Sequence, residues 1–262
     1  MTEGGGGTAG EPVYDRIGRG YTAQRVADHR WQAAIDAALG DAATVVNVGA
    51  GAGSYEPADR STIAIEPSSR MIAQRPAGSA PVVRGVAEAL PVADATVDAA
   101  LAVLTTHHWT DAAAGLAELR RVAARQVVVT WAPEVTARFW LVADYLPEIA
   151  VHEATLATLA AVVAGLPGAE VSTLPVPADI TDGVLGAHWA RPEAYLDPAV
   201  RTSISSLSLL PGPVVERAMA RLAADLDSGA WHDRYGHLLG RAETDLGYRL
   251  VVAGSRRRVT AG

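Results

Sequence analysis

The sequence contains neither cysteine nor lysine. Without cysteine there is no disulfide, no thiolate nucleophile and no cysteine-held zinc or iron–sulfur cluster. Without lysine there is no Schiff base and no lysine-bearing phosphate loop. All 22 basic residues are arginines, and the 29 acidic residues give a formal net charge of −7. This acidic balance argues against nucleic acid as the main partner.

Long apolar runs are also missing, since none reaches the roughly 18 residues that would span a bilayer. The start of the chain lacks the basic and apolar regions of a signal peptide, so we expect a cytoplasmic protein without a membrane partner. Residues 1–11 are rich in glycine and are predicted to be disordered. The 262 residues, of which 49% are hydrophobic, suffice for one domain with an insertion.

A β-branched run at residues 44–48 predicts a strand that is buried on both faces. Gly49, Gly51 and Gly53 follow at every second position. Such a glycine loop lets the backbone approach a ligand closely, because no Cβ stands in the way. A dinucleotide-binding G-x-G-x-x-G loop would have its third glycine where this chain has Ser54. An NAD-dependent dehydrogenase is therefore disfavoured, and the Tyr-x-x-x-Lys pair is also absent.

A second apolar run, residues 62–65, ends in Glu66. In nucleotide-binding α/β folds, an acid at the tip of the second strand hydrogen-bonds ribose hydroxyls. The G-x-G-x-G loop and this acid resemble motif I and its acidic partner in class I S-adenosylmethionine-dependent methyltransferases. The resemblance implies a first set of cofactor contacts: Asn47, Gly49, Ala50, Gly51, Gly53, Glu66, Pro67 and Met71.

The loop departs from the family pattern at one position. Motif I commonly carries Asp or Glu two residues before its first glycine, where this chain has Asn47. An amide can accept or donate a hydrogen bond, but it cannot balance positive charge. The departure concerns the contacts of the loop and leaves the predicted cofactor unchanged.

Residues 85–111 resemble a second pattern of the same family, G-x-A-E-x-L-P followed by an acid that opens the fourth strand. The resemblance implies that Ala87 and Glu88 lie beside the adenine, whose amino group the acid often binds. A solvated loop acid is the alternative reading of Glu88. The fourth strand is predicted at residues 99–104, and its last residue, Leu104, joins the predicted cofactor contacts.

The fourth strand leads into His107, His108 and Trp109. Ligands of open α/β sheets lie outside the carboxyl ends of the strands, so these side chains are candidates to meet the methyl donor and acceptor. Both histidines are candidate catalytic bases, because histidine titrates near neutrality. Adjacent residues of a strand point to opposite sides, so at most one of them should face the cavity. Alternatively, this segment packs beneath the cofactor and opens the next helix.

Residues 12–25 contain the form Y-D-R-I-G-x-G-Y-x-x-x-R. It resembles the N-terminal segment of small-molecule methyltransferases related to the ubiquinone-pathway enzymes, which folds over the cofactor pocket. By that resemblance Tyr14 and Tyr21 line the pocket, on the acceptor and cofactor sides respectively. Arg25 would meet the methionine carboxylate of the cofactor. The alternative is that both tyrosines only anchor the segment to the core.

The order of elements predicts an α/β, Rossmann-like, doubly wound fold. Residues 12–133 would form the cofactor-binding core, residues 134–247 a helical insertion, and residues 248–262 the last strand and a tail. A last strand after a helical insertion matches the seven-stranded sheet of the methyltransferases, in which that strand is antiparallel. We expect the insertion to form a lid over the acceptor site.

Three tryptophans are candidate contacts for the acceptor in addition to Trp109. Trp131 follows the predicted fifth strand, and Trp140 and Trp189 belong to the predicted insertion. Their flat rings would stack on an aromatic or heteroaromatic acceptor, and they would also suit a cationic amine. Tryptophan is an ordinary core residue as well, so a structural role stays open.

Together these features predict an S-adenosylmethionine-dependent methyltransferase of secondary metabolism, which would release S-adenosylhomocysteine. Its acceptor would be a small, aromatic or heteroaromatic molecule methylated at oxygen, nitrogen or carbon. No metal site is predicted, because the sequence lacks ligands at metal-binding spacing. The alternative is a protein that binds S-adenosylmethionine without catalysis and acts as a regulator or partner. The sequence leaves open whether the chain is a monomer or a homodimer.

Overall fold

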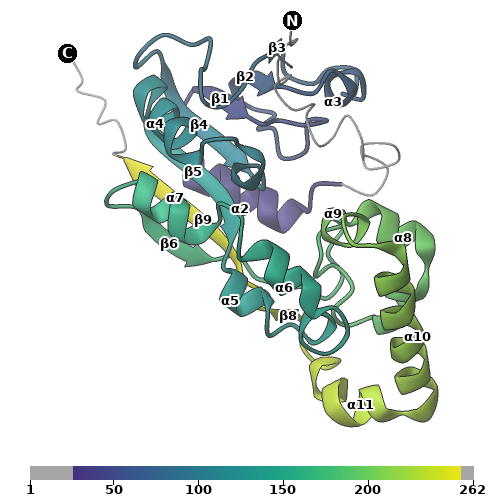
Figure 1. The fold of residues 1–262 in the computed structure, drawn as a ribbon. Coiled ribbons are helices and arrows are strands. Elements are labelled where there is room, and N and C mark those ends of the chain that lie inside the picture. Colours follow the sequence, from purple (N-terminus) through teal and green to yellow (C-terminus); the bar gives the residue numbers. More distant parts are fainter. Residues whose placement is uncertain (1–25, 255–262) are drawn as a thin grey trace, which may run out of the picture.

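The computed structural model describes residues 26–254. They form a seven-stranded sheet that is covered by helices, with a mostly helical insertion beside it (Figure 1). The seven strands are β1 (Thr44–Val48), β2 (Ser61–Glu66), β3 (Val82–Arg84), β4 (Val97–Val103), β5 (Ala123–Trp131), β6 (Glu170–Thr173) and β9 (Tyr248–Gly254).

The order of the strands across the sheet is β3-β2-β1-β4-β5-β9-β6. The first five strands along the chain pair in parallel. Strand β9, by contrast, runs antiparallel between β5 and β6. The predicted Rossmann-like sheet with an antiparallel last strand is confirmed. The order reverses direction at β1 and β4, and a switch of this kind opens a crevice at the carboxyl ends of the strands.

Each face of the sheet has its own hydrophobic core. On one face α2 (His29–Leu39) buries Trp31 and Ile35 against the strands. On the other, α4 (Ala112–Val122) and α7 (Leu159–Gly165) pack together. Strands β1, β4 and β5 contribute to both cores, which explains why their sequences read as continuous apolar runs.

Of the remaining helices, one follows β2, and the others lie within or beside residues 134–247, the segment that the sequence predicts as an insertion. Helix α3 (Ser69–Ala73) follows β2. The others are α5 (Pro133–Thr136), the π-helical turn η3 (Leu141–Tyr145), α6 (Pro147–Glu153), η4 (Pro192–Leu196), α8 (Pro198–Ser203), α9 (Ser205–Ser208), α10 (Gly212–Ser228), α11 (Ala230–Tyr235) and η5 (Gly236–Leu238). A short ribbon of β7 (Val176–Pro177) and β8 (Glu243–Thr244) completes it.

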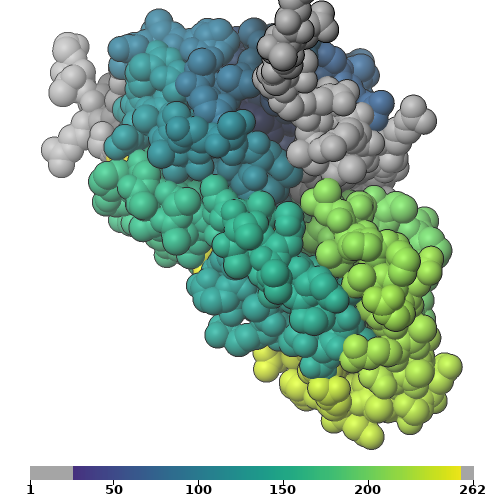
Figure 2. All heavy atoms as spheres, in the orientation of Figure 1, coloured from purple at the N-terminus to yellow at the C-terminus, as the bar shows by residue number. Residues whose placement is uncertain are grey.

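Two elements within residues 134–247 belong to the sheet layer, namely α7 and the edge strand β6. The rest lies at the side where β5 leads into α5, and the green helices α8 and α10 form its outer layer (Figure 1). In the space-filling view the insertion and the sheet layer meet along a broad boundary (Figure 2). Among residues 26–254, no helix combines the length and the apolar character needed to cross a membrane.

Candidate functional site

The loop after β1 has the left-handed backbone that glycine adopts most readily. The φ angles are +68° at Gly49, +54° at Gly51 and +97° at Gly53. The N–H of Gly49 donates to the carbonyl of Ile65 at 2.8 Å, which ties the loop to β2. A Cβ on Gly49 would stand 2.0 Å from Oγ1 of Thr105. The loop therefore touches the segment after β4, and only glycine fits at this contact.

Glu66, the last residue of β2, is 4% exposed. Its Oε2 accepts a hydrogen bond from the N–H of Gly51 at 2.8 Å, and its Oε1 accepts one from the N–H of Ser68 at 2.9 Å. These bonds hold the carboxylate against the glycine loop. Because each carboxylate oxygen accepts more than one hydrogen bond, the acid can also receive hydroxyl donors from a ligand.

A buried ion pair braces the far end of the loop. Arg75 lies 2.5 Å from Glu56, and their side chains are 5% and 10% exposed. Arg75 also donates to the carbonyl of Gly51 at 3.3 Å, and both side chains bond to Ala80. Sequence reasoning missed this pair, because neither residue belongs to the loop pattern. The pair couples the loop to the chain that leads into β3.

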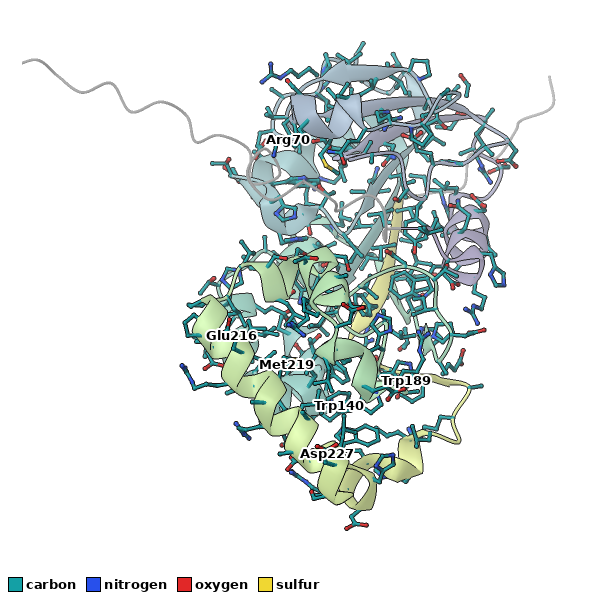
Figure 3. The ribbon with its side chains drawn as sticks, turned by 90° about the vertical axis from the view of Figure 1, so that its right-hand side faces the viewer. Arg70, Trp140, Trp189, Glu216, Met219 and Asp227 are labelled. Carbon is teal, nitrogen blue, oxygen red and sulfur yellow. The ribbon has the colours of Figure 1, made fainter. Side chains whose placement is uncertain are left out.

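The other predicted cofactor contacts surround this loop. Asn47 is buried in β1, where Ala64 and Leu101 are its neighbours across the parallel strands. The methyl group of Met71 lies 3.4 Å from where a Cβ on Gly51 would stand. Figure 3 shows the neighbouring Arg70 at the same end of the sheet. The structure thus gathers the predicted contacts of the first two strands: Asn47, Gly49, Ala50, Gly51, Gly53, Glu66, Pro67 and Met71.

Glu88 is half-buried, and its carboxylate bonds to the backbone before α4. It accepts from the N–H of Thr110 at 2.7 Å and from the N–H of Asp111 at 3.1 Å. The adjacent Ala87 is 5% exposed and packs in the core on the α4 face. The contact of this pair with adenine stays a prediction, and the carboxylate has a structural role besides it.

The two candidate histidines do not lie on a strand. Strand β4 ends at Val103, and a 3₁₀ turn, η2 (Thr106–His108), follows. The expectation that strand alternation sends the two rings to opposite sides is therefore wrong. Their ring centroids are 3.7 Å apart, and His107 lines a pocket together with Leu104. The catalytic role of His107 and His108 stays a prediction.

Trp109 packs against α4. A Cβ on Gly115 would lie 2.4 Å from the indole ring, so this glycine makes room for it. The ring adds to the hydrophobic core on that face of the sheet. This packing is compatible with the alternative in which the segment after β4 has a structural role. The contact of Trp109 with the acceptor stays a prediction.

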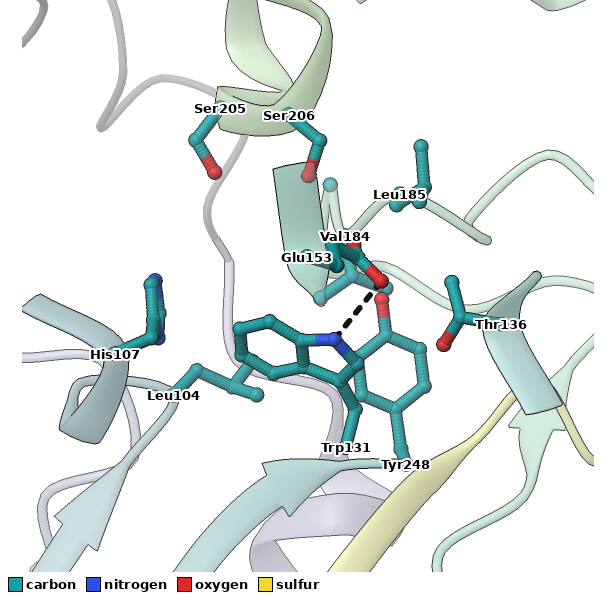
Figure 4. Close-up of a pocket in the computed structure, with 11 residues that line it drawn as sticks. Leu104, His107, Trp131, Thr136, Glu153, Val184, Leu185, Ser205, Ser206 and Tyr248 are labelled. Atoms are coloured by element: carbon teal, nitrogen blue, oxygen red, sulfur yellow. Dashed lines mark hydrogen bonds between the residues drawn. The ribbon is translucent and has the colours of Figure 1, made fainter. Parts of the chain in front are cut away.

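A pocket that is in part open to solvent lies where β4 and β5 end against the insertion (Figure 4). The lining residues come from the segments after β4 and β5, from α6, from β9 and from the insertion: Leu104, His107, Trp131, Thr136, Glu153, Gly183, Val184, Leu185, Ser205, Ser206 and Tyr248.

Glu153, the last residue of α6, is the acid of this pocket. It is 4% exposed, and its Oε2 accepts a hydrogen bond from Nε1 of Trp131 at 3.0 Å. Burial raises the pKa of its carboxyl group to about 7, an effect that the bond from Trp131 partly offsets. Sequence reasoning missed this residue, because a single glutamate in a helical stretch carries no signal of its own.

Of the four tryptophans that the sequence predicts to contact the acceptor, Trp131 lines the pocket. The structure places Trp140 and Trp189 in the core of the insertion instead, where they are 2% and 0% exposed. Nε1 of Trp140 donates to the carbonyl of Trp189 at 3.0 Å, and Nε1 of Trp189 donates to the carbonyl of Val176 at 3.1 Å. Figure 3 shows both tryptophans in the lower part of the view, within the insertion and to the right of α10. Neither tryptophan lines this pocket, because both are used for packing.

Three predicted site residues, Tyr14, Tyr21 and Arg25, lie outside the described residues, and their roles stay predictions. Within residues 26–254, no three histidine, aspartate or glutamate side chains gather closely enough to hold a metal ion. The glycine loop after β1, the acid ending β2 and the adjoining pocket together define a Rossmann-like site for a nucleoside-bearing cofactor.

Comparison with known proteins identifies the family. A family model described as a methyltransferase domain matches residues 46–129. The chain is 30% identical, at a TM-score of 0.80, to a solved protein of Anabaena variabilis assigned as a methyltransferase of an antibiotic biosynthesis pathway. That match covers 88% of this chain and 99% of the other. No curated protein sequence matches the chain.

A second likeness concerns the fold alone. A chain in the complex between the Haloferax volcanii Trm112 methyltransferase activator and a methyltransferase is 15% identical, at a TM-score of 0.50. The match covers 94% of this chain and 97% of the other. The protein belongs to the class I S-adenosylmethionine-dependent methyltransferases, and S-adenosylmethionine is its cofactor. The positive-φ glycine loop and the carboxylate of Glu66 that lies against it fit this group.

Proposed function

We propose that this methyltransferase acts on a small, aromatic or heteroaromatic acceptor, which binds in the pocket between the sheet and the insertion. One observation carries the proposal. The pocket begins at Leu104 and His107, on either side of Thr105, which contacts Gly49 of the cofactor loop. Acceptor and cofactor would therefore meet at the carboxyl ends of β4 and β5, where ligands of open α/β sheets bind.

The pocket walls support an aromatic acceptor. Trp131 and Tyr248 pair across β5 and β9, and both contribute to the lining. The ring of His107 stands edge-on to Trp131, with the centroids 4.7 Å apart. Aromatic walls hold flat ligands by offset or edge-to-face contacts. The likeness to the Anabaena protein supports a role in secondary metabolism.

S-adenosylmethionine, when bound, supplies an electrophilic methyl group. The chain's own residues then mainly position the acceptor and exclude water, which suffices for an in-line displacement at carbon. Glu66 and the glycine loop would hold the cofactor, and the Trp131 wall would orient the acceptor. His107 and His108 are the proposed bases for an acceptor that must lose a proton early.

The first test is a calorimetric titration of the full chain with S-adenosylhomocysteine, with NAD as the control. We expect saturable binding of S-adenosylhomocysteine alone. Transfer of a tritium-labelled methyl group to a panel of phenols, indoles and aryl amines would then establish turnover. Cofactor binding without turnover of any acceptor would favour the non-catalytic alternative, and binding of NAD alone would contradict the assignment of the loop.

A further inference from the structure

The pocket holds a buried acid without a basic partner. Among the described residues, Glu153 makes no ion pair, and its hydrogen-bond donor is the neutral indole N–H of Trp131. No arginine is among the described residues that line the pocket. Glu153 is 4% exposed, and burying an unpaired carboxylate costs folding free energy. A functional role would explain why the acid is present at this position.

A structural role does not explain the acid. A glutamine at this position would accept the same hydrogen bond from Trp131, and it would not carry the cost of a buried charge. The carboxylate also faces the pocket rather than the solvent. In Figure 4 it points into the space bounded by Trp131, Tyr248 and Ser206. The lining residues are otherwise neutral apart from the imidazole of His107.

We propose that Glu153 recognises the acceptor, and that the acceptor is an arylalkylamine, an aromatic ring joined through an alkyl chain to an amine, whose ammonium group pairs with this carboxylate. The ammonium would supply the missing counter-charge and its own hydrogen-bond donors. The aryl part of the acceptor would then lie against Trp131, on the same side of the pocket as the Trp131–Glu153 bond. Tryptophan faces attract cations as well as flat rings, so one wall serves both parts of such a ligand.

The negative charge of Glu153 also predicts which acceptors bind poorly in the pocket. A carboxylate or phosphate on the acceptor would meet Glu153, and the lining residues among positions 26–254 include no arginine to offset the repulsion. A neutral alcohol of the same shape would fill the pocket but would leave the acid without a counter-charge. The net charge of −7 of the whole chain favours the approach of cations as well. This inference rests on the proposed function, because it names the acceptor class of that same pocket.

Three probes of similar shape test the inference: 2-phenylethylamine, 2-phenylethanol and 3-phenylpropanoate, which are a cation, a neutral molecule and an anion at neutral pH. Their dissociation constants for the full chain are measured by calorimetry with S-adenosylhomocysteine present. We expect the wild-type protein to bind the amine about tenfold or more tightly than the alcohol, and the carboxylate most weakly.

Two variants assign the preference to one side chain. Glu153→Gln keeps the acceptor for the Trp131 N–H and should bind the amine and the alcohol equally well. Glu148→Gln is the matched control, since Glu148 is an exposed acid on the same helix, α6, and should keep the wild-type preference. Circular dichroism confirms that each variant is folded, and the comparison of probes on the wild-type protein needs no variant.

The inference is overturned if the wild-type protein binds the alcohol or the carboxylate as tightly as the amine, if the preference survives in Glu153→Gln, or if none of the probes binds. The titration with S-adenosylhomocysteine separates this failure from a failure of the proposed function. Cofactor binding without an amine preference would reject the acceptor class alone. Binding of the amine without any binding of S-adenosylhomocysteine would reject the methyltransferase assignment.

Discussion

At the scale of single residues, the two acids of the site, Glu66 and Glu153, differ in the hydrogen-bond donors that surround them. Glu66 accepts hydrogen bonds from the backbone N–H groups of Gly51 and Ser68, which hold it against the glycine loop. Glu153 accepts a hydrogen bond from the indole N–H of Trp131, and burial raises its pKa to about 7. The first arrangement suits a permanent acceptor of hydroxyl groups. The second suits a group whose charge is stabilised when a ligand arrives.

The raised pKa of Glu153 predicts how stability depends on pH. Since the ordinary value is 4.5, the folded chain holds more protons at this group than the unfolded chain does between pH 4.5 and 7. Stability from this group is therefore present at pH 4 and is lost as the pH rises to 8. The loss amounts to about 3 kcal/mol at roughly 1.4 kcal/mol per pKa unit.

Glu153→Gln removes this dependence, because an amide does not titrate. We expect the difference in unfolding free energy between this variant and the wild type to shift in favour of the variant by about 3 kcal/mol from pH 4 to pH 8. Urea unfolding at the two pH values measures it, with Glu148→Gln as the control. Parallel pH profiles for Glu153→Gln and the wild type would show that Glu153 is not buried as described.

The position of Glu66 beside the glycine loop predicts that its substitution weakens cofactor binding. Glu66→Gln keeps one acceptor oxygen but removes the charge, so S-adenosylhomocysteine should bind about 10- to 100-fold more weakly, as expected for the loss of hydrogen bonds to an ionised group. Calorimetry on the full chain measures this change, with Glu148→Gln as the control again. An unchanged dissociation constant would refute the assignment of Glu66 to the ribose hydroxyls.

At the scale of elements, the loop after β1 combines two demands on glycine. Gly49 has a φ of +68°, and a Cβ there would collide with Thr105. Gly40, which ends α2, has a similar φ of +62°, but a Cβ there would meet nothing within 4 Å. The pair thus separates the cost of the backbone conformation from the cost of the close approach.

Alanine at these two glycines should therefore have unequal effects. Gly40→Ala should cost about 1–2 kcal/mol of unfolding free energy from backbone strain alone. Gly49→Ala should cost clearly more, because the loop or Thr105 must also move, and it should weaken S-adenosylhomocysteine binding. Urea unfolding and calorimetry test both statements. Equal losses at the two sites would mean that the contact between the loop and Thr105 is not as close as described.

The elements that the sequence predicts are those whose signal is local. The strand, glycine loop and acid at residues 44–66 appear in order, because backbone conformation and strand burial leave a pattern within a few neighbours. The end of β4 was less predictable, since a 3₁₀ turn replaces the strand just before the histidines. Propensity alone does not set that boundary, because the tertiary contact of Thr105 with Gly49 also acts there.

The pocket was predictable only in part, for a different reason. Trp131 could be placed by its position at the end of a strand. Glu153 could not, because its character depends on a partner 22 residues away and on burial by the insertion. Trp140 and Trp189 show the reverse problem. Tryptophan suits both a ligand wall and a core, and only the packing of the insertion shows that these two belong to its core.

At the scale of the whole molecule, a buried polar cluster joins three distant parts of the chain. The hydroxyl of Tyr55 donates to Asp182 at 3.0 Å and accepts from the N–H of Asp28 at 3.2 Å. Both aspartates are fully buried. The bidentate hydrogen bond from Arg30 holds the pKa of Asp28 well below its usual range. The cluster links the start of α2, the chain after the glycine loop and the insertion.

Tyr55→Phe should loosen this connection. The change leaves Asp182 without the hydroxyl donor, and we expect a loss of about 1–3 kcal/mol in unfolding free energy. Hydrogen exchange should rise at residues 180–186 more than in the sheet strands β1 and β4. Tyr235→Phe serves as a comparison, because Tyr235 bonds Asp144 within the insertion. Equal exchange at residues 180–186 in Tyr55→Phe and the wild type would argue against the link.

The position of β9 determines when the sheet can be completed during synthesis of the chain. Among the described strands, β6 has one neighbour in the sheet, β9, which is also the last of them to leave the ribosome. Until then β5 shows an open edge, and β6 has nothing to pair with. The order of synthesis therefore differs from the order of assembly, and the sheet closes only when the chain returns from the insertion. Contacts so far apart in sequence close slowly, so the edge of β5 stays open to pairing with other chains until β9 is in place.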